Sequence, residues 1–344
     1  DINPNPKVLN FNILQSKNML IEKHWSASLY DLGDGVASIK LHSVLKPELN
    51  PIDGSMMQVF AKSLDWVAQN NYKGLVISGD GANFCAGANL NLILQASERK
   101  DFDALENLIG AMQQIFQSVR FANFPVVAAP YGLVLGGGME IIGACDKRVA
   151  AAESYIGLVE VGVGLIPGAG GNLRMLSNLS KKIKTGITGT LPLVQKAFET
   201  IGFAKVATSA KQAQSYGYLL ADDKISINRD HILFEAKNSV IDLSENYKKP
   251  EIQTFKLPGS AGRIAIDVQA KSLVKAGKIS KHDAFIGSKL AYVLTGGKKG
   301  GLFTSVDEQY LLDIERESFL SLCGEPKTQD RIRYMLTKGK PLRN

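Results

Sequence analysis

Two glycine-rich stretches, each close to a glutamate, constrain this chain of 344 residues more than any other feature. The first is Gly136-Gly137-Gly138, which leads into Glu140, and the second spans residues 166–171 (IPGAGG), shortly after Glu160. Three glycines ahead of an isoleucine pair predict a turn that opens a helix, where the first backbone N–H groups lack partners within the helix. Such a helix start favours a negatively charged oxygen. A tight turn with close packing is an equally good interpretation of the glycines alone.

Residues 84–90 (FCAGANL) offer a second group of small residues with accessible backbone N–H groups. They follow a strand-like run at 74–78 and precede a helical stretch. One backbone donor from this segment and one from the glycine triplet could stabilise an enolate or thioester oxygen without any side chain. The small residues would allow a ligand to approach closely.

The order FCAGANL, GGGME, IPGAGG resembles the enoyl-CoA hydratase/isomerase (crotonase) superfamily. The resemblance implies an α/β fold, a crotonase-like spiral of ββα units followed here by a C-terminal helical region. It implies an oxyanion hole formed by the N–H groups of Ala88 and Gly137, and two catalytic glutamates, Glu140 and Glu160. The implied substrate-binding residues are Ala86, Gly87, Asn89, Leu90, Leu135, Gly136, Pro167 and Gly168.

Two positions depart from the family pattern. Leu158-Val159-Glu160 stands where hydratases usually have Gln-Pro-Glu, and Asn89 stands where many members have Asp. Glu153 is a rival carboxylate near Glu160, but it precedes a strand at a position where solvent exposure is the default. We therefore assign the second catalytic role to Glu160.

The resemblance implies hydration of trans-2-enoyl-CoA to 3-hydroxyacyl-CoA in fatty-acid β-oxidation. Glu140 would activate the water and Glu160 would deliver a proton to C2. Three alternatives stay open: an enoyl-CoA isomerase, which commonly needs one glutamate, an acyl-CoA hydrolase of the same fold, and a non-catalytic docking subunit. The docking interpretation predicts a lost glutamate or a filled glycine site, and the sequence has neither.

The chain is expected to contain a linker or boundary segment at 1–25, a hydratase domain at 26–250 and a helical extension at 251–344. Apolar spacing predicts helices at 264–276, 282–294 and 308–322 in the extension. Residues 29–36, 257–259, 308–319 and 339–344 resemble the C-terminal hydratase part of bifunctional 3-hydroxyacyl-CoA dehydrogenases. This resemblance implies an N-terminal dehydrogenase half outside this chain, and a start at Asp1 agrees with it.

Further elements follow from spacing and turn residues. We expect a hairpin of strands at 27–30 and 36–41, and a helix capped by Asp53 that continues to residue 69. A second long helix is expected at 105–119, with strands at 124–129 and 147–151. Residues 95–103 are mostly polar and predict a mobile loop, and the first 24 residues show no periodicity.

Composition and charge limit the kinds of partner that the sequence predicts. Residues 1–175 carry 13 basic and 16 acidic groups, whereas residues 176–344 carry 27 and 17, so the basic excess lies in the second half. Without interleaved aromatic platforms, this excess does not predict nucleic-acid binding, although it could steer the phosphates of coenzyme A. Four scattered histidines and three isolated cysteines predict neither a metal site nor a disulfide framework.

A soluble cytoplasmic protein without a membrane span is expected. The implied hydration needs no cofactor besides the coenzyme A carried by the substrate, and NAD would serve only the dehydrogenase half. Because the family commonly forms trimers, a homo-oligomer is a further expectation from the resemblance.

Overall fold

A computed structural model describes residues 8–183, 189–301 and 303–344. The chain forms two compact units. Unit 1 comprises Asp1–Ala88, Gln114–Ile156 and Ala207–Glu251, and unit 2 comprises Asn89–Gln113, Gly157–Val206 and Ile252–Asn344. Unit 2 therefore combines the C-terminal region with two segments from the middle of the chain.

Unit 1 is built on a seven-stranded sheet with the order β1-β2-β3-β4-β5-β7-β9. The first three strands pair antiparallel, and the pairs from β3 to β9 are parallel. Parallel strands are typically buried on both faces, and Leu75, Val76 and Ile77 of β4 are fully buried here. The strands are β1 Leu20–Lys23, β2 Ala27–Asp31, β3 Val36–Leu41, β4 Gly74–Gly79, β5 Val126–Ala128, β7 Lys147–Ala151 and β9 Lys224–Ser226.

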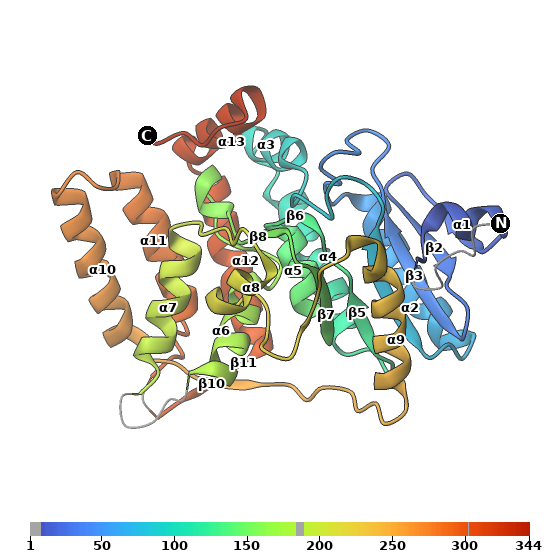
Figure 1. Cartoon of the computed structure of the whole chain (residues 1–344). Helices are drawn as coiled ribbons and strands as arrows, with labels where there is room; N and C mark the ends of the chain where they lie inside the picture. The colour runs from blue at the N-terminus through green and yellow to red at the C-terminus, as the bar shows by residue number, and fades with distance from the viewer. Residues whose placement is uncertain (1–7, 184–188, 302) are drawn as a thin grey trace. The chain divides into compact units, whose positions relative to one another are not determined.

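Helices cover the sheet of unit 1. Helix α9 packs on β4, β5 and β7, and α2 packs on β2 and β3 (Figure 1). The helices of this unit are α1 Phe11–Ser16, α2 Gly54–Gln69, α5 Gly137–Ala144, α8 Ala210–Tyr216 and α9 Ile232–Ser244, with the short 3-10 helix η2 Arg229–His231. Two further strands, β6 Gly132–Leu135 and β8 Ser154–Gly157, flank the segment that contains α5.

Unit 2 is mainly helical. Its helices are α3 Leu90–Glu98, α6 Gly171–Lys182, α7 Leu191–Gly202, α10 Gly259–Lys275, α11 Lys281–Leu294, α12 Glu308–Cys323 and α13 Pro326–Lys338, with the 3-10 helix η1 Glu160–Val163. Helix α11 contacts α7, α10 and α12, and α13 packs against α3 and η1 (Figure 1). A small antiparallel pair, β10 Thr254–Lys256 and β11 Ser305–Asp307, precedes α12. Helix α4, Phe102–Arg120, begins in unit 2 and ends in unit 1.

Several predicted elements are confirmed. Strands β2 and β3 form the expected antiparallel hairpin, and the Asp53 side chain accepts the Met56 N–H at the start of α2, which ends at Gln69. The glycine triplet opens a helix, α5, as expected. The three helices predicted in the C-terminal region are α10, α11 and α12. The mixed α/β fold with a C-terminal helical region is therefore confirmed.

One expectation is wrong. Residues 95–103 are not a loop, because Gln95–Glu98 end α3 and α4 begins at Phe102. In the N-terminal segment, where the sequence shows no periodicity, Phe11–Ser16 form α1 and Leu20–Lys23 form β1, which pairs with β2. The division into 1–25, 26–250 and 251–344 stays a prediction.

Candidate active site

The segment 84–88 lies beside β6 in unit 1. The Cys85 N–H donates to Leu133 O at 3.1 Å, and the Leu135 N–H donates back to Cys85 O at 3.0 Å. On the other side, the Ile52 N–H donates to Gly87 O at 2.9 Å. Because β6 leads directly into the glycine triplet, these bonds bring Ala88 next to Gly137.

Each glycine of the triplet is required for a different reason. Gly136 has φ +53° and ψ −121°, a combination that is costly for residues with a Cβ. A Cβ at Gly137 would lie 2.6 Å from Ile52 Cδ1 and 3.5 Å from the Ala88 nitrogen. A Cβ at Gly138 would overlap the Cys85 carbonyl oxygen. The triplet therefore permits a backbone approach that other residues would block.

The backbone of Gly137 lies close to the backbone nitrogen of Ala88. Gly137 is the first residue of α5, where a helix leaves its N–H without an internal partner. Throughout the described ranges, no hydrogen bond is found from the N–H of Ala88 or of Gly137. Two neighbouring donors at the positive end of a helix are suited to an oxyanion.

Glu140 lies in the first turn of α5 and its side chain is buried, with 4% exposed. Cys85 is nearby and also buried, and burial raises the pKa of its thiol to about 12, with a smaller contribution from the charge of Glu140. A thiol with this pKa stays protonated at neutral pH and is a poor nucleophile. Cys85 therefore packs against the candidate site without acting as a nucleophile. Glu140 is the neighbouring side chain that could transfer a proton there.

The other predicted contacts in unit 1 help to shape this backbone pair. The Ala86 N–H donates to Leu49 O at 2.8 Å, and Gly87 has φ +105°. A Cβ at Gly87 would lie 3.3 Å from Leu135 O and 3.6 Å from the Gly137 nitrogen. These residues belong to the same small cluster, but their contact with substrate stays a prediction.

Unit 2 holds the remaining predicted site residues. Glu160 is half-buried and opens η1, whereas Glu153, in unit 1, is exposed. Asn89 caps α3 by accepting the Asn91 N–H at 3.1 Å, so its side chain has a structural partner, and Leu90 begins this helix. The structure thus groups Ala88, Gly137 and Glu140 in one unit and places Glu160 in the other.

The second glycine stretch, in unit 2, contacts the C-terminal region. Gly168 O accepts from Gln113 Nε2 at 2.8 Å, and a Cβ at Gly168 would meet the Phe319 ring at 2.8 Å. Pro167 O accepts from Asn172 Nδ2 at 3.2 Å. Pro167 and Gly168 are buried, and their predicted role in substrate binding is not tested by these contacts.

Residues of α12 and α13 that sequence reasoning missed support the segments around Glu160 and IPGAGG. The buried Glu315 carboxylate accepts the N–H groups of Gly170 and Asn172 at the start of α6. Thr328 donates to Gly164 O at 2.9 Å. No local pattern marks these side chains, because their partners lie about 150 residues away in the sequence.

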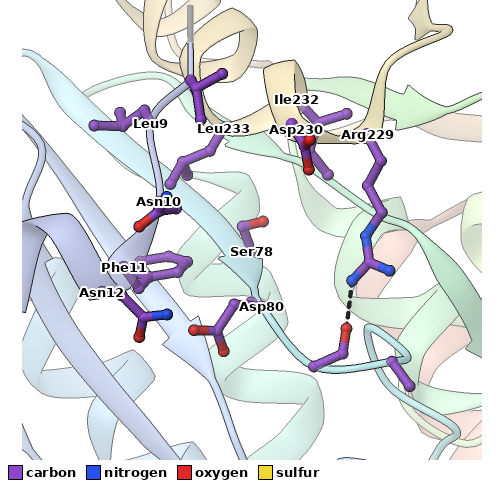
Figure 2. Close-up of a pocket in the computed structure, with 14 residues that line it drawn as sticks. Leu9, Asn10, Phe11, Asn12, Ser78, Asp80, Arg229, Asp230, Ile232 and Leu233 are labelled. Atoms are coloured by element: carbon purple, nitrogen blue, oxygen red, sulfur yellow. Dashed lines mark hydrogen bonds between the residues drawn. The ribbon is translucent and has the colours of Figure 1, made fainter. Parts of the chain in front are cut away.

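A separate pocket of about 560 Å³ lies in unit 1 at the carboxyl end of β4 (Figure 2). Figure 2 shows Phe11 and Asp80 on one side of it and Arg229 on the other. The Arg229 guanidinium donates to Gly81 O and lies 4.0 Å from the centre of the Tyr131 ring. None of the predicted site residues lines this pocket.

The chain belongs to the enoyl-CoA hydratase/isomerase family, whose sequence profile matches residues 31–220. The whole chain is 42% identical to a "Probable 3-hydroxyacyl-CoA dehydrogenase" of Bacillus subtilis, of which it covers 42%. It is also 26% identical, over 78% of its length, to a peroxisomal fatty acid beta-oxidation multifunctional protein of Oryza sativa, of which the match covers 35%. The chain thus spans about two fifths or less of the length of these relatives.

Solved structures show the same fold. The enoyl-CoA hydratase from Bacillus halodurans matches 89% of this chain and 98% of its own with a TM-score of 0.60 at 15% identity. The enoyl-CoA hydratase from Bacillus anthracis matches 78% of this chain and 90% of its own with a TM-score of 0.52 at 23% identity. At these identities the likeness concerns the fold alone.

Within the part of the chain that the structure describes, no helix is long and apolar enough to cross a membrane.

Proposed function

We propose that the chain adds water to trans-2-enoyl-CoA thioesters to give 3-hydroxyacyl-CoA, as a step of fatty-acid β-oxidation. The observation that supports this most directly is the pair of N–H groups at Ala88 and Gly137, with Glu140 in the first turn of the same helix. An enolate oxygen that forms on the thioester during hydration needs this kind of preorganised donor pair. The family match supports the same class of reaction.

In the proposed mechanism, Glu140 takes a proton from the water that attacks C3, and Glu160 gives a proton to C2. The N–H groups of Ala88 and Gly137 hold the thioester oxygen while it carries negative charge. A positioned acid or base contributes typically about 10²- to 10⁴-fold to the rate, and one oxyanion donor about 10²- to 10³-fold. Two glutamates favour hydration over a double-bond shift, which commonly needs one.

The names of the relatives support the proposed pathway. The Bacillus subtilis relative is named as a 3-hydroxyacyl-CoA dehydrogenase and the Oryza sativa relative as a fatty acid beta-oxidation protein. We infer that this chain is the hydratase part of a bifunctional enzyme whose NAD-dependent dehydrogenase half oxidises the 3-hydroxyacyl product. Coenzyme A enters the hydratase site only as part of the substrate.

The test follows the loss of ultraviolet absorbance of the conjugated thioester, with crotonyl-CoA and with a medium-chain 2-enoyl-CoA. Glu140→Gln and Glu160→Gln keep the side-chain shape but remove the carboxylate. Each is expected to lower kcat by at least about 100-fold, because each removes a proton-transfer group. Glu153→Gln is the matched control, since Glu153 is exposed and close in sequence to Glu160, and it should keep wild-type activity.

The alternatives give different results. A large loss in Glu140→Gln alone, together with a shift of the double bond, would indicate an isomerase. Release of free coenzyme A would indicate a hydrolase. Binding of the thioester without any turnover would support a docking role and contradict the proposed function.

A further inference from the structure

The backbone that follows Glu160 is held by helix α13 of the same unit. Glu160 opens η1, which ends at Val163 and is followed by its C-cap residue, Gly164. The Leu165 N–H donates back to Glu160 O at 3.0 Å. The fully buried Thr328 hydroxyl donates to Gly164 O at 2.9 Å. The turn that carries Glu160 is therefore tied to Thr328 at its far end.

The Thr328 hydroxyl lies within hydrogen-bond distance of two groups, Gly164 O at 2.9 Å and His282 Nε2 at 3.0 Å. When the hydroxyl donates to Gly164 O, its oxygen is left to accept from the Nε2–H tautomer of neutral His282. The pKa of His282 is lowered to about 4, first by burial and then by the charges of Arg331 and Lys327, so the ring is neutral near pH 7.

Gly164 lies against α13 with no room for a side chain between them. Gly164 has φ +85°, and a Cβ there would lie 3.0 Å from Thr328 Cα and 3.2 Å from Arg331 Cδ. Arg331 is fully buried and holds α13 in place through Asp283 Oδ1 and Asn344 Oδ1, both at 2.8 Å. The Thr328 hydroxyl therefore lies between the Gly164 backbone and a helix, α13, that Arg331 holds in place.

We propose that Thr328 is a positioning residue for Glu160, through its hydrogen bond to Gly164 O. This inference rests on the proposed function, in which Glu160 transfers a proton to C2. The hydroxyl does not act on the substrate. It keeps the η1 turn in one conformation, so that the Glu160 carboxylate stays at the distance and angle that proton transfer requires. Displacement of a reacting group by about 1 Å can cost on the order of 10²-fold in rate.

The first experiment compares Thr328→Val, which removes the hydroxyl and keeps the shape, with Thr328→Ser, which keeps the hydroxyl. Thr328→Val is expected to lower kcat for crotonyl-CoA hydration by about 10- to 100-fold with little change in KM. Thr328→Ser should retain most of the activity. Thr295→Val is the matched control, because Thr295 is also buried in unit 2 but, at the C-cap of α11, donates to Ala291 O of that helix. The kcat of this variant should be unchanged.

A second comparison asks whether Thr328 acts through Glu160. Thr328→Val should cause no further loss in a Glu160→Gln background, because no carboxylate is left to position. An equal loss in both backgrounds, or no rescue by Thr328→Ser, would overturn the proposal. Failure of the proposed function itself has a separate signature, which is the absence of hydration by the wild-type chain.

Hydrogen exchange at the Leu165 amide provides a readout that does not depend on activity. This amide donates to Glu160 O, so looser packing of the η1 turn exposes it to solvent. We expect Thr328→Val to speed its exchange at least about 10-fold, whereas Thr295→Val leaves it unchanged. Unchanged exchange in Thr328→Val would contradict the positioning role even if the chain proved to have another activity.

Discussion

At the scale of single residues, the glycine triplet shows what sequence can and cannot predict. The helix start follows from the three glycines and the apolar pair after them. The separate requirement at Gly138 does not, because it depends on the carbonyl of Cys85, more than 50 positions earlier in the chain. The position of Ala88 beside Gly137 depends on the same pairing with β6. Sequence therefore identifies the small residues, and the fold explains why each must be small.

Gly138→Ala should destabilise the protein by about 1 to 3 kcal/mol, because the new methyl group overlaps backbone atoms of Cys85 that have no room to move. Gly110→Ala is the matched control, since a Cβ there meets nothing within 4 Å inside helix α4. It should stabilise the helix by about 0.5 to 1 kcal/mol. Urea unfolding measures both changes, and equal stability of the two variants would contradict the packing described here.

At the scale of elements, regular apolar spacing predicts the helices correctly, whereas local polarity does not predict where a loop lies. Helix α2 has a clear apolar stripe and a capping aspartate, and both bounds agree with the structure. Residues 95–103 were expected to be a loop because they are mostly polar. Gln95 and the charged residues of this stretch are exposed, whereas Ser97 is buried. The chain turns at Lys100, which has φ +56°. A short turn between two exposed helices has too little length to leave a clear pattern.

Helix α11 carries a buried histidine that should make stability depend on pH. The pKa of His282 is about 4 in the folded chain and about 6.5 when unfolded, so the unfolded state binds more protons between these values. Its stabilising contribution is complete above pH 6.5 and is lost as the pH falls toward 4. The expected loss is on the order of 3 kcal/mol.

The measurement is the urea unfolding midpoint of wild type and His282→Gln between pH 7 and pH 4. Glutamine can still donate a hydrogen bond toward Thr328 but does not titrate in this range. The wild-type midpoint should fall more steeply than that of the variant. Parallel curves for the two proteins would show that His282 does not carry this dependence.

At the scale of the whole molecule, the candidate site divides into a part that sequence could predict and a part that it could not. The proposed oxyanion donors and the proposed catalytic glutamates fall in short motifs, so they could be assigned from the resemblance. Glu315, Thr328 and Arg331 resemble ordinary surface residues of amphipathic helices, yet all three are buried. Their partners come from distant parts of the chain, and no periodicity records such pairings.

Two arginines that contact the same carboxylate allow a direct test of how unit 2 is held. Arg331 is fully buried and lies 2.8 Å from Asp283 Oδ1, whereas Arg343 is largely exposed and lies 3.0 Å from the same oxygen. Arg331→Leu should cost about 3 to 5 kcal/mol, because it leaves a largely buried carboxylate without its buried partner. Arg343→Leu should cost less than about 1 kcal/mol. Similar unfolding midpoints for the two variants would contradict the assigned difference in burial.

The interleaved course of unit 2 also has a consequence for a newly made chain on the ribosome. Every segment of unit 1 has been synthesised once residue 251 is complete, but Gly164 meets Thr328 only 164 positions after its own synthesis. At about 5 to 20 residues per second, this interval is roughly 8 to 30 seconds. During that time the sheet and the oxyanion pair can form, while the turn that bears Glu160 still lacks its support. In a nascent chain, the proposed oxyanion donors can therefore form before Thr328 is available to hold the turn that bears Glu160.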